Sequence, residues 1–238
     1  MKRLKTGFLA LTILLFILSG CGTNEQPTVL QSQTPSSIPS KAIEDIPGMT
    51  TGQRNALSCA ESYLSRLAFS YEGLVDQLEF EGFSREEAVF AAENCGEDWN
   101  EQALKKANDY LKSSAFSYSG LISQLEYEKF TTEEATYGVD NCGADWNEQA
   151  VDKAKSYLRS SAFSYTGLIE QLEYSGFTTE EATHGADNCN ADWNEQAVKK
   201  AKSYLRTGSW SREKLIHQLE YSGFTYEQAV YGVEQNGY

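Results

Sequence analysis

The 238 residues include 34 acidic and 20 basic side chains, so the chain has a formal net charge of −14 at neutral pH. Such a charge repels the phosphates of nucleic acids and of anionic lipids, and it favours basic partners. Acidity that only keeps an exported protein soluble would explain the same composition. Removal of residues 1–20, which hold three basic residues and no acidic residue, would leave −17.

The first segment has the pattern of an export signal. Three basic residues precede an apolar run over residues 8–18, which is shorter than the roughly 20 apolar residues of a membrane-spanning helix and is typical of a signal peptide. The sequence Leu-Ser-Gly-Cys over residues 18–21 resembles a bacterial lipobox. The resemblance implies a signal peptide over 1–20, cleavage before Cys21 and attachment of a diacylglycerol or acyl lipid (palmitate) to Cys21. An ordinary secretory signal with a chance cysteine is the alternative.

A linker follows the lipidated cysteine, over residues 21–52. It contains all four prolines among serines, threonines and glutamines, and no apolar period. This composition predicts a disordered tether with an r.m.s. reach of roughly 30 Å. We therefore expect the rest of the chain to be held close to the outer membrane surface.

The remainder of the chain is an internal repeat. Trp99, Trp146 and Trp193 fall 47 residues apart, each inside Asp-Trp-Asn-Glu-Gln-Ala. A fixed period of this length is typical of an array of small supersecondary units. We place the repeats at 53–99, 100–146, 147–193 and 194–238.

Caps and apolar spacing predict three helices in each repeat. Asp145 caps a first helix whose Lys153 should face solvent, Ser117 caps a second helix, and Thr131 caps a third with Glu134 closing a capping box. The third helix has a stripe of small residues that would let it approach its neighbours closely: Ala135, Gly138, Val139 and Cys142. The predicted fold is an all-α array of helix-turn-helix-like units.

Glycine is expected to end the second helix in a left-handed conformation in three copies, at Gly82, Gly176 and Gly223. The second copy has Lys129 at this position. A left-handed lysine should cost on the order of 1 kcal/mol if its backbone is the same.

The titratable residues argue against metal binding and catalysis. Cysteine and histidine pairs with zinc-ligand spacing do not occur, and the acidic cluster around Asp140 and Asp145 lacks the ligand order of a calcium loop. A disulfide between Cys59 and Cys95 is conceivable in an exported protein. We expect no enzyme activity, no metal and no cofactor beyond the lipid on Cys21.

Aromatic residues off the core stripes recur in every repeat. They could pack between repeats, or they could form an acidic, tyrosine-rich binding face. On the second interpretation the candidate partner-binding residues are Tyr127, Glu133, Glu134, Tyr137, Tyr174, Glu180, Glu181, Tyr221 and Tyr231. Glu133 and Glu134 begin the helix that would read DNA in a helix-turn-helix, so nucleic acid is not expected as a partner.

The repeat carries Gly-Leu, Gln-Leu-Glu-Tyr, Gly-Phe-Thr, Glu-Glu-Ala, Asp-Asn-Cys and the tryptophan motif in fixed order. This unit resembles the repeat of the Ltp-type host cell surface-exposed lipoproteins. The resemblance implies tandem three-helix domains lipid-anchored on the outer face of a Gram-positive cytoplasmic membrane. For prophage-encoded members it implies superinfection exclusion, in which binding of the phage tape measure protein blocks DNA injection.

We therefore expect a non-enzymatic binding lipoprotein whose partner is a tape measure protein or another basic helical protein. The alternative is a cell-envelope binding or adhesion module with peptidoglycan or a surface protein as its ligand.

Cys21→Ala should move the protein from the membrane fraction to the precursor form or the medium, because the lipid attachment site is lost. Fractionation followed by immunoblotting measures the shift. Unchanged, detergent-dependent retention of the variant in the membrane fraction would show that Cys21 is not the anchor.

Overall fold

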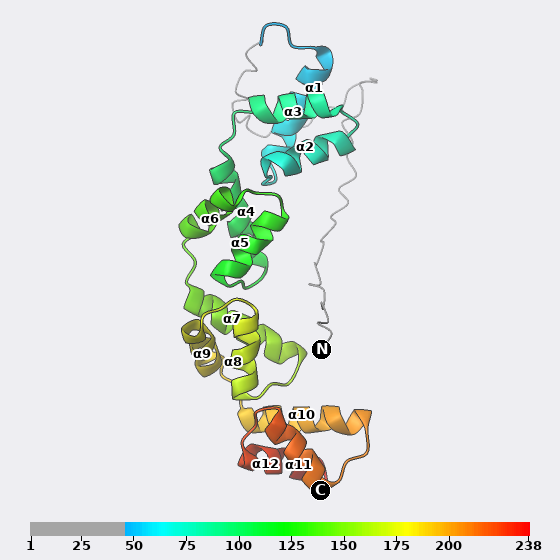
Figure 1. Ribbon diagram of the computed structural model, residues 1–238, viewed down its shortest axis with the longest axis vertical. Coiled ribbons are helices and arrows are strands. Elements are labelled where there is room, and N and C mark those ends of the chain that lie inside the picture. Colours follow the sequence, from blue (N-terminus) through cyan, green and yellow to red (C-terminus); the bar gives the residue numbers. More distant parts are fainter. Residues whose placement is uncertain (1–45) are drawn as a thin grey trace, which may run out of the picture.

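The computed structural model describes residues 46–238, and within this range it consists of helices joined by short loops (Figure 1). The predicted signal peptide, Cys21 and most of the predicted tether lie outside the described residues. The helices are α1 (Thr51–Leu64), α2 (Tyr71–Phe80), α3 (Arg85–Asn94), α4 (Trp99–Ser113), α5 (Tyr118–Tyr127), α6 (Thr132–Asn141), α7 (Trp146–Ser160), α8 (Tyr165–Tyr174), α9 (Thr179–Asn188), α10 (Trp193–Thr207), α11 (Arg212–Tyr221) and α12 (Tyr226–Glu234).

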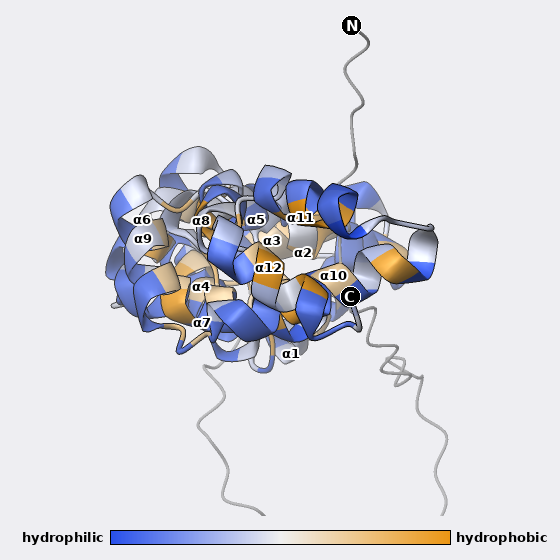
Figure 2. Ribbon diagram, turned by 90° about the horizontal axis from the view of Figure 1, so that it is seen from below, coloured by the Kyte–Doolittle hydropathy of each residue, from blue (hydrophilic) through white to orange (hydrophobic). Residues whose placement is uncertain are grey.

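The helices group in threes, and the four groups follow one another along the long axis of the molecule (Figure 1). In each group the third helix packs against both the first and the second. Seen along the long axis, hydrophilic residues dominate the outside of the helices (Figure 2). The prediction of an all-α array of four three-helix repeats is confirmed. We number the repeats 1 to 4 from α1–α3 to α10–α12.

Local sequence sets the helix ends as expected. Ser117 and Asp145 cap α5 and α7, and Thr131 caps α6 in a capping box with Glu134. The residues that end the middle helices have positive φ: 97° at Gly82, 89° at Gly176, 85° at Gly223 and 69° at Lys129. Lys129 thus adopts the same left-handed backbone that glycine adopts in the other copies.

Two leucines of each middle helix are fully buried and form the centre of each core: Leu74, Leu78, Leu121, Leu125, Leu168, Leu172, Leu215 and Leu219. The small stripe on α6 faces α4. A Cβ atom added to Gly138 would lie 2.7 Å from the carbonyl carbon of Ala103, so the two backbones touch. Gly185 and Gly232 approach Ala150 and Ala197 in the same way, whereas repeat 1 has Ala91 at this position.

Serine hydroxyls join each repeat to the next. The N-cap hydroxyl of α5, Ser117 Oγ, accepts a bond from Gly120 N–H (3.1 Å) and donates to the carbonyl of Ser175 at the end of α8 (2.6 Å). Ser70 donates to Glu128 O and Ser164 to Ser222 O, also at 2.6 Å. All three serines are 1% exposed. The N-terminus of each middle helix therefore meets the C-terminus of the middle helix in the next repeat.

The first helix of each following repeat completes the joint. Trp99, at the start of α4, packs against the core of repeat 1 and contacts Tyr71 edge-to-face, with 5.6 Å between ring centroids. The predicted boundaries place this tryptophan at the end of a repeat, but it belongs to a helix of the following one. The Trp99 ring thus packs against repeat 1, whereas the helix that carries it belongs to repeat 2.

Lys153 also serves the joint, and the prediction that it faces solvent is wrong. Its ammonium donates to the carbonyl of Ala115 in the preceding repeat (3.1 Å) and lies 5.6 Å from the Phe116 ring centroid and 5.7 Å from that of Tyr157. Lys106 reaches Ala68 O of repeat 1 in the same manner. The helical spacing put Lys153 on the side of α7 that faces away from the apolar stripe. The preceding repeat covers that side.

Gly138→Ala should destabilise the array by roughly 1–3 kcal/mol, because the new methyl group overlaps the α4 backbone. Helix propensity alone would stabilise the variant by about 1 kcal/mol. Ser156→Ala, at an exposed position of α7, is the control and should change stability by less than about 0.5 kcal/mol. Thermal unfolding followed by circular dichroism distinguishes the two. A Gly138→Ala protein that melts at or above the wild-type temperature would contradict the close packing.

Ser117→Ala should cost more than Ser211→Ala, although both serines cap a middle helix. Ser211 is exposed and accepts from Lys214 N–H, whereas loss of Ser117 also leaves the carbonyl of Ser175 without its donor. The difference should be about 1 kcal/mol or more in urea unfolding. Equal losses in the two variants would show that the hydroxyl bridge between repeats contributes nothing.

Candidate partner-binding surface

One aromatic residue ends every middle helix and is exposed to solvent. Phe80, Tyr127, Tyr174 and Tyr221 are 82%, 65%, 74% and 88% exposed, and we call them the aromatic series. They do not pack between repeats, which was one of the two interpretations of the recurring aromatic residues. Of the candidate partner-binding residues, three tyrosines belong to this series.

The hydroxyl groups of the series differ from those of the tyrosines that begin the middle helices. Within residues 46–238, the hydroxyls of Tyr127, Tyr174 and Tyr221 form no intramolecular hydrogen bond. Tyr118, by contrast, donates to Asp140 (2.8 Å), and this bond raises the pKa of the Tyr118 phenol. The series thus presents rings and hydroxyls that no other part of the described structure uses.

A glutamate precedes each ring of the series, and a neighbouring side chain holds it. Glu126 accepts from Thr132 Oγ1 (2.7 Å) and Glu173 from Thr179 Oγ1 (2.6 Å). In repeat 1 Glu79 pairs with Arg85 (2.9 Å), and in repeat 4 Glu220 contacts His217 (3.1 Å). Sequence reasoning did not select these four glutamates, although their recurrence beside the aromatic position was a usable signal.

The four glutamates among the candidate partner-binding residues are of two kinds. Glu133 and Glu180 are exposed. Glu134 and Glu181 are half-buried and accept the N-cap backbone N–H groups of Thr131 (2.9 Å) and Thr178 (2.8 Å). Their carboxylates therefore stabilise helix starts, and of these four glutamates it is Glu133 and Glu180 that extend into solvent.

The other two selected tyrosines lie on third helices. Tyr137 is 37% exposed and donates its hydroxyl to Glu101 of α4 (3.0 Å), and Tyr231 is 44% exposed. His184 occupies the equivalent position in repeat 3. This position is less exposed and less uniform than the aromatic series.

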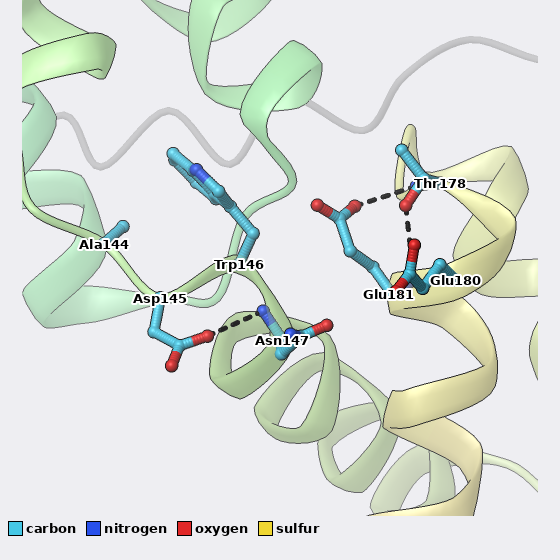
Figure 3. A pocket seen from close by; sticks show the side chains of 7 residues that line it. All are labelled: Ala144, Asp145, Trp146, Asn147, Thr178, Glu180 and Glu181. Carbon is cyan, nitrogen blue, oxygen red and sulfur yellow. Dashed lines mark hydrogen bonds between the residues drawn. The ribbon is translucent and has the colours of Figure 1, made fainter.

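A depression of about 550 Å³ lies between the N-termini of α7 and α9 (Figure 3). Three of its polar side chains serve as caps, since Asp145 binds Asn147 N–H (2.9 Å) and Thr178 exchanges bonds with Glu181, whereas Glu180 is exposed. A smaller depression of about 330 Å³ occupies the equivalent place in repeat 1. The caps account for those three side chains, and the depression has no arrangement of nucleophile and base.

The remaining reactive side chains have structural surroundings. Cys142 Sγ donates to Val139 O (3.0 Å), and burial raises the pKa of the Cys95 and Cys189 thiols. The conceivable Cys59–Cys95 disulfide is not formed in the structure. Among residues 46–238, no three His, Cys, Asp or Glu side chains are placed to hold a metal ion. None of the helices in this range has the length and apolar character to span a membrane.

Comparison with known proteins gives a match in every repeat. The family model described as host cell surface-exposed lipoprotein matches residues 52–95, 98–142, 145–189 and 192–235. A solved structure, that of Ltp, a superinfection exclusion protein from the Streptococcus thermophilus temperate phage TP-J34, is 39% identical. That match covers 39% of this chain and 97% of the Ltp chain, with a TM-score of 0.38. A search of curated proteins found no match.

The family match spans most of the chain and coincides with the four three-helix repeats. The chain therefore belongs to the family of host cell surface-exposed lipoproteins.

Proposed function

We propose that this protein acts in superinfection exclusion as a lipid-anchored binding protein, and that it blocks phage DNA injection by binding the tape measure protein. Membership of the surface lipoprotein family supports the cell-surface role. The observation that carries the binding role is the aromatic series, because every repeat exposes a large ring at the same position. Single exposed aromatic residues are ordinary on protein surfaces, so it is the recurrence in all four repeats that indicates binding.

The proposed location is the outer face of the cytoplasmic membrane. The lipobox-like segment ending at Cys21 supports a lipid anchor, and the proline-containing linker supports a short tether. An array held within a few nanometres of the bilayer would meet any phage protein that must cross it. A tape measure protein is long and helical, so its amphipathic segments suit binding along a helical array.

Charge supports a basic partner. The mature chain would carry −17, and Glu133 and Glu180 place exposed carboxylates at equivalent points of repeats 2 and 3. Such a field speeds encounter with a cationic segment and disfavours nucleic acid. Exposed charge pairs are screened beyond about 8–10 Å at physiological salt. Binding should therefore weaken steeply as salt rises.

Binding rather than catalysis is proposed because titratable groups of the described repeats either cap helices or lie at exposed, separate positions. Glu134 and Glu181 close capping boxes, and both histidines are exposed on separate helices. General acid–base chemistry needs two such groups held around one reacting atom. We propose no cofactor other than the lipid on Cys21.

Expression of the protein in a susceptible host should lower phage DNA injection and leave adsorption unchanged. Glu133→Gln/Glu180→Gln should reduce the protection, because an exposed carboxylate is neutralised at the start of the third helix in repeats 2 and 3. Asp109→Asn/Asp152→Asn is the matched control, since it removes two exposed charges from first helices, and it should protect nearly as well as the wild type. Potassium efflux or intracellular phage DNA measures injection, and free phage titre measures adsorption.

A fall in adsorption would contradict the exclusion mechanism. Normal injection combined with sedimentation of the protein on purified cell wall would instead support the cell-envelope binding module, with peptidoglycan or a surface protein as ligand. Binding of a purified tape measure fragment that is insensitive to salt would contradict the electrostatic part of the proposal.

A further inference from the structure

The aromatic series conserves a ring but not a hydroxyl across the repeats of this chain. Phe80 stands where the other three copies have tyrosine, and it is as exposed as they are. The three hydroxyls form no intramolecular hydrogen bond within the described residues, whereas the hydroxyl of Tyr165, the first residue of α8, donates to Asp187 (2.8 Å). The recurring feature is thus an exposed aromatic face, and aromatic faces attract cations.

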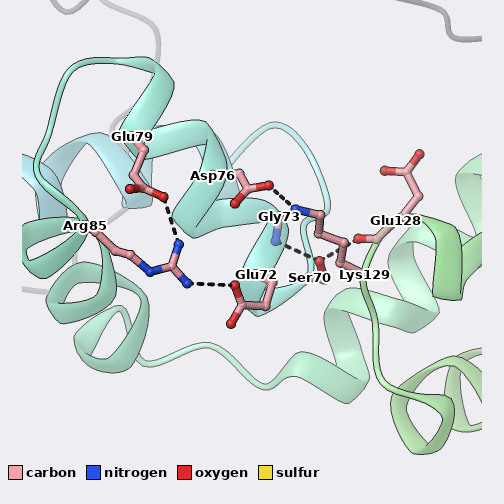
Figure 4. A network of polar contacts seen from close by, with 8 residues as sticks. All are labelled: Ser70, Glu72, Gly73, Asp76, Glu79, Arg85, Glu128 and Lys129. Carbon is pink, nitrogen blue, oxygen red and sulfur yellow. Dashed lines mark hydrogen bonds and ion pairs between the residues drawn. The ribbon is translucent and has the colours of Figure 1, made fainter.

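A glutamate directly precedes each ring in the sequence, and its charge is compensated unequally along the array. In repeats 2 and 3 the partners of Glu126 and Glu173 are neutral threonine hydroxyls, so the negative charge is not compensated there. In repeat 1 Arg85 forms ion pairs with Glu79 (2.9 Å) and Glu72 (3.4 Å) (Figure 4). Arg85 thus offsets part of the charge of Glu79, whereas Glu126 and Glu173 have no cationic partner among the described residues.

The joints hold the rings at fixed intervals. Each ring ends a middle helix, and in repeats 2 to 4 the buried bonds of Ser70, Ser117 and Ser164 attach the end of that helix to the preceding repeat. A ligand that contacts two rings therefore loses little further freedom at the second contact, which favours ligands that extend over several repeats.

We propose that the aromatic series contacts the ligand, and that it binds a polypeptide through arginine or lysine side chains, with one cation at each ring. This inference rests on the proposed function only in taking the array to be a binding surface. It names the side chains of the partner that are recognised and the rings that recognise them.

The test uses two synthetic alanine-rich helical peptides, one with four arginines and one with glutamine at the same four positions. Binding to the purified full-length protein in detergent is measured by calorimetry at low salt. Tyr127→Ser/Tyr174→Ser should weaken binding of the arginine peptide by roughly 5- to 30-fold, since an exposed cation–π contact changes affinity by about 2- to 5-fold. Tyr127→Phe/Tyr174→Phe should stay within about 2-fold of the wild type.

Two single variants complete the design. Tyr238→Ser removes a ring that is 44% exposed but lies outside the series, and it should leave the affinity unchanged. Phe80→Ser should weaken binding by a factor similar to that of Tyr127→Ser, because the two positions share an exposed ring and not a hydroxyl. Circular dichroism checks that each variant remains folded, as expected for exposed positions.

Equal binding of the glutamine peptide would overturn the inference, as would a double serine variant that behaves like Tyr238→Ser. A double phenylalanine variant as weak as the serine variant would assign recognition to the hydroxyls instead. Binding of a neutral wall polysaccharide that depends on the same rings would assign them to sugar stacking and overturn the cationic ligand. Phage exclusion is scored separately, so exclusion that fails in the wild type contradicts the proposed function while the peptide result still decides this inference.

Discussion

The array depends on one interaction, the buried serine hydroxyl that serves two helices at once. Ser117 accepts from Gly120 N–H inside its own helix and donates to Ser175 O of the next repeat. Both the first-turn N–H group and the last-turn carbonyl would otherwise lack a partner away from water. The side chain at the third helical position must be small, because a Cβ on Gly120 would lie 2.7 Å from Ser117 Oγ. The N-cap of the helix, the bond to the next repeat and the glycine therefore depend on one another.

The other contacts of the joint add specificity around this unit. Threonine or serine hydroxyls reach the next repeat at two joints, where Ser119 donates to Gly176 O (3.0 Å) and Thr166 to Gly223 O (3.3 Å). At the first joint Lys129 forms an ion pair with Asp76 instead (Figure 4). Both side chains are about half exposed, so the pair is weak and salt-sensitive. The first joint thus has an ion pair where the other two have a hydroxyl bond, and the lysine of this pair has a left-handed backbone conformation.

Features that depend on neighbouring residues could be predicted from the sequence, and features between repeats could not. The caps at Ser117, Thr131 and Asp145 bind backbone N–H groups only two or three positions further along the chain. The bond from Ser117 to Ser175 joins residues 58 positions apart and depends on how two folded units stack. A signal for the joint nevertheless existed. Lysine recurs at 106, 153 and 200 but is Cys59 in repeat 1, and glycine recurs at 73, 120 and 167 but is Lys214 in repeat 4. At these two positions, the residue that is missing from an outermost copy lies at a joint between repeats in the other copies.

The second and third joints use the same donor and acceptor at the same distance, since Ser117 meets Ser175 and Ser164 meets Ser222. Repeat 3 could therefore be duplicated in the gene, or removed from it, without creating a joint that the protein does not already contain. Unequal recombination between such similar coding segments would lengthen or shorten the array in whole units. Each event would add or remove one exposed aromatic ring and leave the core of every other repeat unchanged. The number of exposed rings per chain could therefore change in whole steps during evolution.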